Sequence, residues 1–290
     1  MDTFIQLTVI GLANGAILAL AALGFALIYK ATGVINFAQG EFLLIGAYTI
    51  YAAIEVYELH WTVAVLVGVV VAVVLGLIIE RLVLRPMVGE SAIAVIMVTI
   101  GLAAVLRALV QVRFGTTPRR MPAFIPGGTT DVVGALVPTN RLWAILLAAV
   151  ALGAFTVFFR RSRHGIAMRA VADDQQAAMT MGISVPRVFA MAWALAAMSA
   201  VIGGVLVANI TGVSGEVADF GLVVFPVVIL GGLDSVAGTM LGGAIIGVLI
   251  PYTAAYVGGG LQQVIPFVVL VLILMVKPYG LFGQVRIERV

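Results

Sequence analysis

The chain has 290 residues, of which 63% are apolar (Ala, Val, Ile, Leu, Met, Phe, Trp, Tyr or Cys) and only 10% are charged. Soluble domains contain about 45–50% apolar and about 25% charged residues, so this chain has too few polar side chains to coat a water-soluble globule. The mean hydropathy of +1.20 and the small net charge of +3 indicate a protein surrounded by membrane lipid and exclude a disordered or nucleic-acid-binding chain.

Apolar runs long enough to cross a membrane follow one another along the chain. The first, Phe4 to Tyr29, exceeds the apolar region of a signal peptide, about 7–15 residues, so we expect a retained span. A spanning helix needs about 20 apolar residues. Further spans are expected near 35–54, 62–79, 92–112, 141–159, 188–210, 240–256 and 261–276, with 220–231 ambiguous. These runs predict one all-α polytopic membrane domain, residues 1–290, with about eight or nine transmembrane helices.

Basic residues near the ends of these runs predict the orientation of the chain. The densest group consists of Arg160, Arg161, Arg163 and Arg169, with Arg187 closing the same loop. Because loops rich in Lys and Arg stay in the cytoplasm, we expect the segment 160–187 to be cytoplasmic. Alternation, with 220–231 also crossing, then gives an outside N-terminus and a cytoplasmic C-terminus. The other basic groups placed in the cytoplasm are Lys30, Arg81, Arg85, Lys277, Arg286 and Arg289.

A polar break interrupts the second apolar run at Asn36-Phe37-Ala38-Gln39-Gly40-Glu41. Asn36 is suited to cap a helix start, and Gln39, three residues later, is placed to reach back as in a capping box. A carboxylate at the centre of a membrane helix costs about 2.5–3.5 kcal/mol on insertion scales. Glu41 is therefore expected to face a polar lumen, a partner group or the membrane surface. It either meets substrate or holds the broken helix in place.

Arginines also mark the fourth run and the connection after it. Arg107 lies toward the outer end of the run 92–112, and we expect its side chain to snorkel to the surface without a functional role. The connection 113–140 falls outside by alternation although it is basic. Its charged residues, with the first residue after it, are Arg113, Arg119, Arg120, Asp131 and Arg141. Its prolines and glycines predict an irregular loop. The favoured interpretation is a plain connection between two spans, and the alternatives are a loop that packs over the bundle or one that faces another protein.

The segment 160–187 is longer than a connection between two spans requires. Its apolar positions predict short helices between Arg163 and Gly182, stopped by Gly182 and Pro186. Methionines and alanines stand beside charged residues in this segment. This composition predicts a docking surface for another subunit rather than a loop packed on itself.

A second break, Leu230 to Gly238, joins two apolar pieces in the second half, and Asp234 or Ser235 is suited to cap the following helix. Paired glycine-interrupted segments in the two halves of a membrane protein are typical of a transport pathway. We therefore expect two broken or re-entrant segments in related halves, although two capped cytoplasmic turns are the alternative. The predicted pathway residues are Asn36, Gln39, Gly40, Glu41, Gly231, Gly232, Asp234 and Ser235.

Three glycine pairs have the four-residue spacing that lets membrane helices approach closely. They are Gly11 and Gly15, Gly238 and Gly242, and Gly243 and Gly247. These pairs predict helix packing rather than chemistry.

The sequence offers little for catalysis. It lacks cysteine, and His60 and His164 are too far apart in the sequence to build a zinc site, so we expect no catalytic residue, metal or cofactor in this chain. Neither Lys30 nor Lys277 lies in a P-loop sequence, so the chain does not hydrolyse ATP by that route. An intramembrane hydrolase needs a nucleophile with a base, a zinc motif or facing aspartates, and an ion channel needs a filter but no large docking loop. Transport is favoured over both classes.

Four stretches in order, residues 33–42, 176–183, 231–235 and 278–283, resemble the permease subunits of branched-chain amino-acid ABC importers of the high-affinity leucine, isoleucine and valine type. The resemblance covers nearly the whole chain. It implies a permease of a bacterial-type inner membrane that pairs with a second, similar permease, two ATP-binding subunits that hydrolyse ATP, and an extracytoplasmic substrate-binding protein. The implied substrate is a branched-chain or related aliphatic amino acid. Urea and short-chain amide permeases of the same family are the alternative.

The resemblance also implies a role for the cytoplasmic segment. Residues 165–182 look like the coupling region that docks in a groove of the ATPase subunit, and 176–182 is a loose version of the importers' EAA-type loop. The implied coupling residues are Arg163, Gly165, Arg169, Gln176, Ala177, Ala178 and Gly182. The chain departs from the usual pattern at Gln176, where relatives carry Glu, at Gln39, where many carry His, and at Asp234, where Gly is frequent.

Overall fold

The computed structural model describes residues 2–122 and 124–283, so Arg286 and Arg289 of the expected cytoplasmic tail lie outside the described residues. The helices within these ranges are α1 (Asp2–Thr32), α2 (Gln39–Tyr51), α3 (Trp61–Ile79), α4 (Ala92–Phe114), α5 (Thr139–Arg161), α6 (Arg163–Asp173), α7 (Gln175–Thr180), α8 (Val185–Thr211), α9 (Glu216–Gly231), α10 (Val236–Tyr256) and α11 (Ile265–Val276). Short π-helical segments continue α2 to Val56 and α3 to Leu84.

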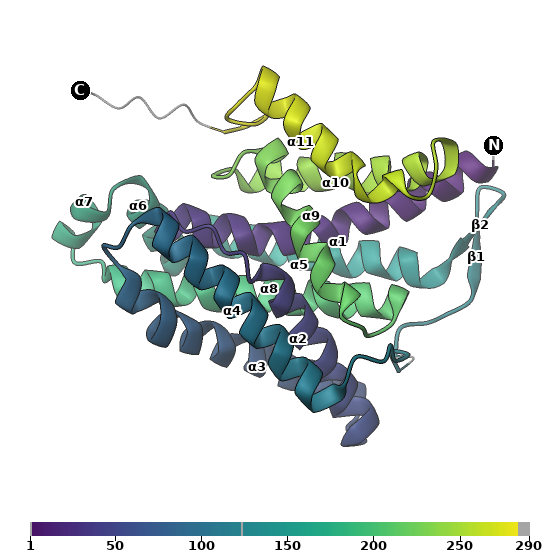
Figure 1. The fold of residues 1–290 in the computed structure, drawn as a ribbon, viewed down its shortest axis with the longest axis horizontal. Helices are drawn as coiled ribbons and strands as arrows, with labels where there is room; N and C mark the ends of the chain where they lie inside the picture. Colours follow the sequence, from purple (N-terminus) through teal and green to yellow (C-terminus); the bar gives the residue numbers. More distant parts are fainter. Residues whose placement is uncertain (1, 123, 284–290) are drawn as a thin grey trace.

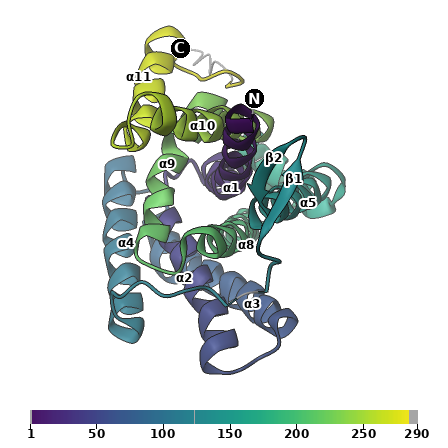
Figure 2. The same cartoon turned by 90° about the vertical axis from the view of Figure 1, so that its right-hand side faces the viewer.

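Six helices in the described part of the chain are long and apolar enough to cross a membrane, by length and composition: α1, α3 with its extension, α4, α5, α8 and α10. The apolar helix α11 is shorter. In α1 and α8, 72% of the most apolar 18-residue stretch is buried in the protein, whereas in α4 and α5 only 22% of that stretch is buried. The core therefore forms around α1 and α8, and the other helices surround them (Figures 1 and 2).

Glycines let α10 pack against two neighbouring helices at backbone distance. On one side, a Cβ at Gly247 would collide with the backbone of Gly15, and a Cβ at Gly11 would lie 2.7 Å from the Val248 Cα atom. On the other side, Gly238 and Gly242 meet the backbone of α9. The predicted packing role of the glycine pairs is confirmed, because side chains at these positions would push the helices apart.

The structure corrects the expected helices at two places. The run 35–54 is not helical from its start, since residues 33–38 form a connection and α2 begins only at Gln39. Pro186, expected to stop a helix, lies in the first turn of α8. A proline is compatible with a first turn because its missing N–H group would have no intrahelical partner there.

The connection 113–140 is more ordered than the expected irregular loop, and its strands contradict a purely helical chain. Strands β1 (Thr129–Val132) and β2 (Ala135–Pro138) form an antiparallel hairpin. Arg119 forms a β-bridge with Val213, and its Nη1 atom donates to the Tyr51 hydroxyl at 3.2 Å. Figure 1 shows the hairpin at one end of the bundle, beside the N-terminus, and α6 and α7 at the opposite end.

Candidate functional site

The first break is held by side-chain hydrogen bonds in the buried interior. Asn36 Oδ1 accepts from the Ala38 N–H at 3.0 Å, and Asn36 Nδ2 donates to Gln39 Oε1 at 3.2 Å. Gln39 Nε2 also donates to the Ala21 carbonyl at 3.1 Å. The predicted capping box is wrong, because α2 begins at Gln39 with Ala38 at its N-cap and no side-chain cap bond. The side chains of Asn36 and Gln39 bond to each other instead. Both residues are fully buried.

The start of α2 lies deep in the bundle rather than at its end. Gln39 contacts Ala21, which precedes the end of α1 at Thr32 by eleven residues. At 1.5 Å per residue this places the start of α2 about 16 Å inward from that end. Gly40 packs against Ala218 and Gly221 of α9 at backbone distance. The polar break and the beginning of α9 are thus joined far from the end of α1.

An ion-pair network connects α2, α4 and α9 at this position. Arg107 donates to Glu41 Oε1 from Nη2 at 2.9 Å and from Nε at 3.1 Å. The same Nη2 atom lies 3.4 Å from Asp219 Oδ1. The expectation that Arg107 snorkels to the membrane surface is wrong, because its guanidinium turns to the buried Glu41. A carboxylate in this position needs such a partner, since leaving it buried and unpaired is costly.

Exposure differs strongly among the three charged side chains. Glu41 is 5% exposed, Arg107 is 38% exposed and Asp219 is 57% exposed. The network therefore extends from the buried Glu41 to the partly exposed side chains of Arg107 on α4 and Asp219 on α9. Sequence reasoning assigned no function to Arg107 and did not single out Asp219. An arginine within an apolar span is itself a signal to search for a carboxylate on another helix.

The second break is closed by backbone packing. A Cβ at Gly231 would collide with Gly238, and Gly232 has a φ of +107°, which favours glycine. The C-terminal stretch covers this point, since the Phe282 N–H donates to the Gly231 carbonyl at 3.0 Å. Ser235 Oγ accepts from the Gly238 N–H at 3.0 Å, so Ser235 caps α10, as one of the two predicted candidates.

The two breaks do not meet at one point. Gly40 contacts α9 at Gly221, whereas Gly231 ends the same helix ten residues later. Ten residues of helix span about 15 Å. The predicted pathway residues thus form two groups, one near each end of α9.

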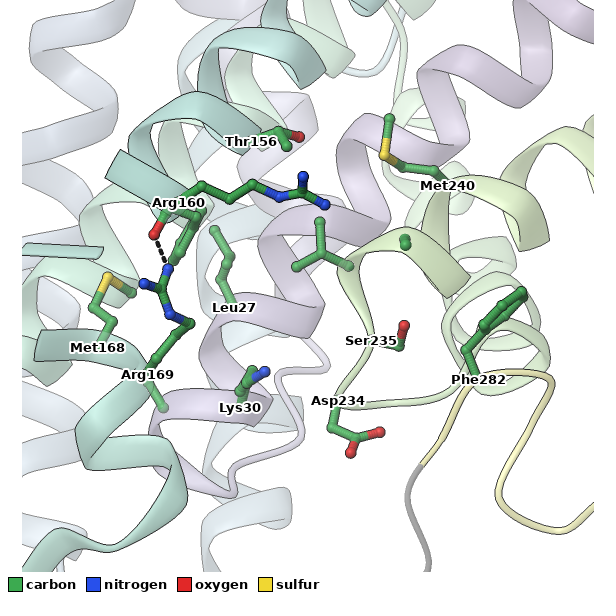
Figure 3. Close-up of a pocket in the computed structure, with 14 residues that line it drawn as sticks. Leu27, Lys30, Thr156, Arg160, Met168, Arg169, Asp234, Ser235, Met240 and Phe282 are labelled. Atoms are coloured by element: carbon green, nitrogen blue, oxygen red, sulfur yellow. Dashed lines mark hydrogen bonds between the residues drawn. The ribbon is translucent and has the colours of Figure 1, made fainter. Parts of the chain in front are cut away.

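Asp234 and Ser235 line a cavity of about 350 Å³ (Figure 3). Three basic side chains also line it: Lys30 from α1, Arg160 from α5 and Arg169 from α6. Much of the remaining wall is apolar. Sequence reasoning did not find this cavity, because its charged residues come from separate parts of the chain.

The segment 160–187 folds into two short helices with defined ends. Ser162 Oγ accepts from the Gly165 N–H at 2.8 Å and caps α6. Asp174 Oδ1 accepts from the N–H groups of Gln176 and Ala177 at 2.8 and 2.9 Å and caps α7. Gly182 has a φ of +81° just beyond α7, which confirms the predicted stop.

The predicted coupling residues divide between structural and surface positions. Gly165 packs against the carbonyls of Phe158 and Phe159, and Ala178 is buried. Arg169 is half-buried and donates to the Phe159 carbonyl. Arg163, Gln176, Ala177 and Gly182 are exposed.

Large apolar side chains of the same segment also remain exposed. Ile166 is 52%, Met179 is 55% and Met181 is 82% exposed. Figure 1 shows that α6 and α7 project from the end of the bundle, so these side chains lie at its extremity. Exposed methionines on a projecting element are typical of a surface that packs against another protein.

Known proteins resemble the chain over nearly its full length. A family model described as "Branched-chain amino acid transport system / permease component" matches residues 7–274. The proteins named high-affinity branched-chain amino acid transport system permease protein LivH of Salmonella typhimurium and Escherichia coli are 31% identical over 301 residues, covering 99% of this chain and 98% of the relative. BraD of Pseudomonas aeruginosa is 29% identical with the same coverage. The solved structure of PsaBC from Streptococcus pneumoniae in complex with Fab shares the fold, with a TM-score of 0.52 and 13% identity over 96% of this chain and 94% of that chain.

Proposed function

Because the chain belongs to the family of branched-chain amino acid transport system permease components, we propose that it passes branched-chain or related aliphatic amino acids through the inner membrane. The proposed transporter pairs this permease with a second permease of similar fold. Two ATP-binding subunits drive the pair, and an extracytoplasmic binding protein delivers the substrate. The resemblance in four ordered motifs and the relatives named as transport permeases support this proposed assembly.

The observation that carries the proposed pathway is the network of Glu41, Arg107 and Asp219. Arg107 lies seven residues before the end of α4, and its partner Glu41 lies at the deep start of α2. Charged side chains at such depth do not face lipid, because transfer of charge into hydrocarbon is costly. The partly exposed Arg107 and Asp219 therefore support a surface covered by the second permease or by water.

Figure 2 shows α4, α9 and α11 along one side of the molecule, at the left of the view. We place the second permease against this side, with the pathway between the two chains. A zwitterionic amino acid offers a carboxylate to Arg107 and an ammonium group to Asp219. Urea and short-chain amides carry no net charge and need neither group, so the network favours an amino acid.

The proposed topology adds α2 with its π-helical extension, α9 and α11 to the six longer spans. Nine crossings put the N-terminus outside and the C-terminus in the cytoplasm. The basic segment 160–187 then lies in the cytoplasm, as the distribution of arginines predicts. The hairpin β1–β2, at the opposite end of the bundle, is extracytoplasmic in this arrangement.

Coupling is proposed to occur through α6 and α7. Ile166, Met179 and Met181 provide the apolar contact with the ATP-binding subunit, while the capped ends of both helices keep the segment rigid. Movement of the ATP-binding subunit then reaches the bundle through buried residues of this segment. Met168, Val171 and Ala178 pack against α1 and α8 in one cluster.

Uptake by the complete transporter in liposomes tests the proposal. We expect accumulation of radiolabelled leucine only with ATP inside and loaded binding protein outside, and no comparable uptake of urea or acetamide. Arg107→Gln should reduce the uptake, whereas Arg161→Gln, an exposed arginine without a described ion pair, should not. ATP-independent conductance would instead indicate a channel. Uptake of urea in preference to leucine would assign the chain to the amide branch of the family.

A further inference from the structure

The cavity beside Ser235 has features that the proposed pathway does not use. It lies where α1 and α5 end and α10 begins, with α6 alongside. The basic groups of Lys30, Arg160 and Arg169 all line it (Figure 3). Three helices, one of which belongs to the coupling segment, thus bring positive charge to one hollow at one end of the bundle.

No ion pair among the described residues neutralises these three basic groups. Among residues 2–122 and 124–283, the ion pairs involve only Arg85 and Arg107 on the basic side. Asp234 is the one carboxylate among the lining residues, and Figure 3 shows its side chain turned away from the guanidinium of Arg160. The cavity is therefore electropositive and suited to an anion.

Backbone donors at the start of α10 add to this preference. Val236 and Ala237 line the cavity and form the first turn of the helix. The N–H groups of a first turn have no intrahelical acceptor, and the helix dipole is positive at this end. Ser235 Oγ occupies only the Gly238 N–H among the described bonds. Phosphate groups bind readily at such helix starts when basic side chains are also present.

The apolar residues in the wall of the cavity indicate that the anionic ligand also has an apolar part. The apolar part of the wall consists of side chains from α1, α5 and α10 and from the stretch after α11: Leu27, Phe159, Met240 and Phe282. A free phosphate gains nothing from these side chains, whereas a lipid places its headgroup at the helix ends and its acyl chains along apolar surfaces. Basic pockets between membrane helices on the cytoplasmic side are a known mode of headgroup binding.

We propose that this cavity binds the headgroup of an anionic phospholipid. The phosphate lies among Lys30, Arg160 and Arg169 at the start of α10, and the glycerol and upper acyl chains lie along the apolar wall. Since Arg169 belongs to α6, the bound lipid connects the coupling segment with α1 and α10. An acidic segment of an ATP-binding subunit is the competing occupant, but it has no need of the apolar wall.

Titration of the purified transporter with short-chain lipids tests the proposal. Native mass spectrometry would measure binding of dioctanoyl phosphatidylglycerol, with dioctanoyl phosphatidylcholine as the neutral comparison. We expect Arg160→Gln to weaken phosphatidylglycerol binding about fivefold, which corresponds to about 1 kcal/mol per basic residue. Arg160→Lys should retain most of the binding. Arg161→Gln, next in sequence but absent from the cavity wall, should bind as the wild type does.

Four results would overturn the assignment. Equal binding of the two lipids would remove the requirement for an anion. An equal loss in Arg160→Gln and Arg161→Gln would indicate general surface charge. Competition by inorganic phosphate at the same concentration as the lipid would identify a free phosphate as the ligand. Loss of the ATP-binding subunits from Arg160→Gln, with lipid binding unchanged, would identify a protein docking groove. Thermal unfolding of each variant in neutral lipid separates these results from misfolding.

Discussion

Replacing Arg107 by glutamine is the sharpest test of the network at the start of α2. The side chain of Glu41 is 5% exposed, and that of Arg107 is 38% exposed. Removal of the arginine therefore leaves the more buried partner without a counter-charge. Breaking a buried ion pair in this way costs about 3–5 kcal/mol, and the partial exposure of Arg107 places this pair at the lower end.

We therefore expect Arg107→Gln to lower the free energy of unfolding by about 3 kcal/mol. The loss arises because the variant keeps the buried carboxylate of Glu41 and removes its counter-charge.

Thermal unfolding in detergent measures this effect. The double variant Glu41→Gln/Arg107→Gln should recover part of the loss, since it removes the stranded charge. Asp219→Asn should cost less than about 1 kcal/mol, because Asp219 is 57% exposed and its contact is 3.4 Å long. The electrostatic reasoning fails if the double variant is no more stable than Arg107→Gln, or if Arg107→Gln is as stable as the exposed control Arg161→Gln.

Three further substitutions test the coupling segment, the helix packing and the cap. Gly182→Val should raise the number of ATP molecules hydrolysed per amino acid imported, because a β-branched residue at a φ of +81° costs about 1–3 kcal/mol. The control is Gly153→Val, which lies in open space within α5. Equal ratios of ATP to amino acid in the two variants would contradict a coupling role. Gly247→Leu should abolish the folded peak in size-exclusion chromatography, and normal folding would contradict close packing of α1 and α10. Ser235→Ala should lose about 1 kcal/mol of stability by thermal unfolding, whereas Ser184→Ala, whose side chain makes no cap bond, should not; equal losses would contradict the cap.

The sequence predicted those features that depend on residues close together in the chain. Apolar runs located the long helices, and the glycine at 182 ended a helix as expected. Asp234 and Ser235 were the two candidate caps from their place before an apolar run, and the structure shows that Ser235 makes the bond. The glycine spacing predicted close packing but not the partner helices, because spacing describes one helix face only. Structure was needed to show that Gly243 and Gly247 meet α1 while Gly238 and Gly242 meet α9.

Contacts between distant residues could not be predicted in the same way. Arg107 and Glu41 are 66 positions apart, and their partnership depends on how far α2 begins inside the bundle. The cavity residues Lys30, Arg160 and Ser235 come from three helices whose ends meet only in the folded chain. The strands β1 and β2 were missed because proline and glycine residues around them obscured a hairpin only four residues long on each side.

The packing around the ion-pair network determines which helix moves most easily. Gly40 and Gly221 bring α2 and α9 into backbone contact, so the carboxylates of Glu41 and Asp219 belong to helices that are fixed against each other. Arg107 belongs to α4, and only 22% of the most apolar 18-residue stretch of this helix is buried. Displacement of α4 therefore disrupts less packing within this chain than separation of α2 from α9. A change in the distance between Arg107 and Glu41 during transport would consequently report movement of α4. If the ion pair stayed intact in every state of the transporter, α4 would move together with α2 and α9.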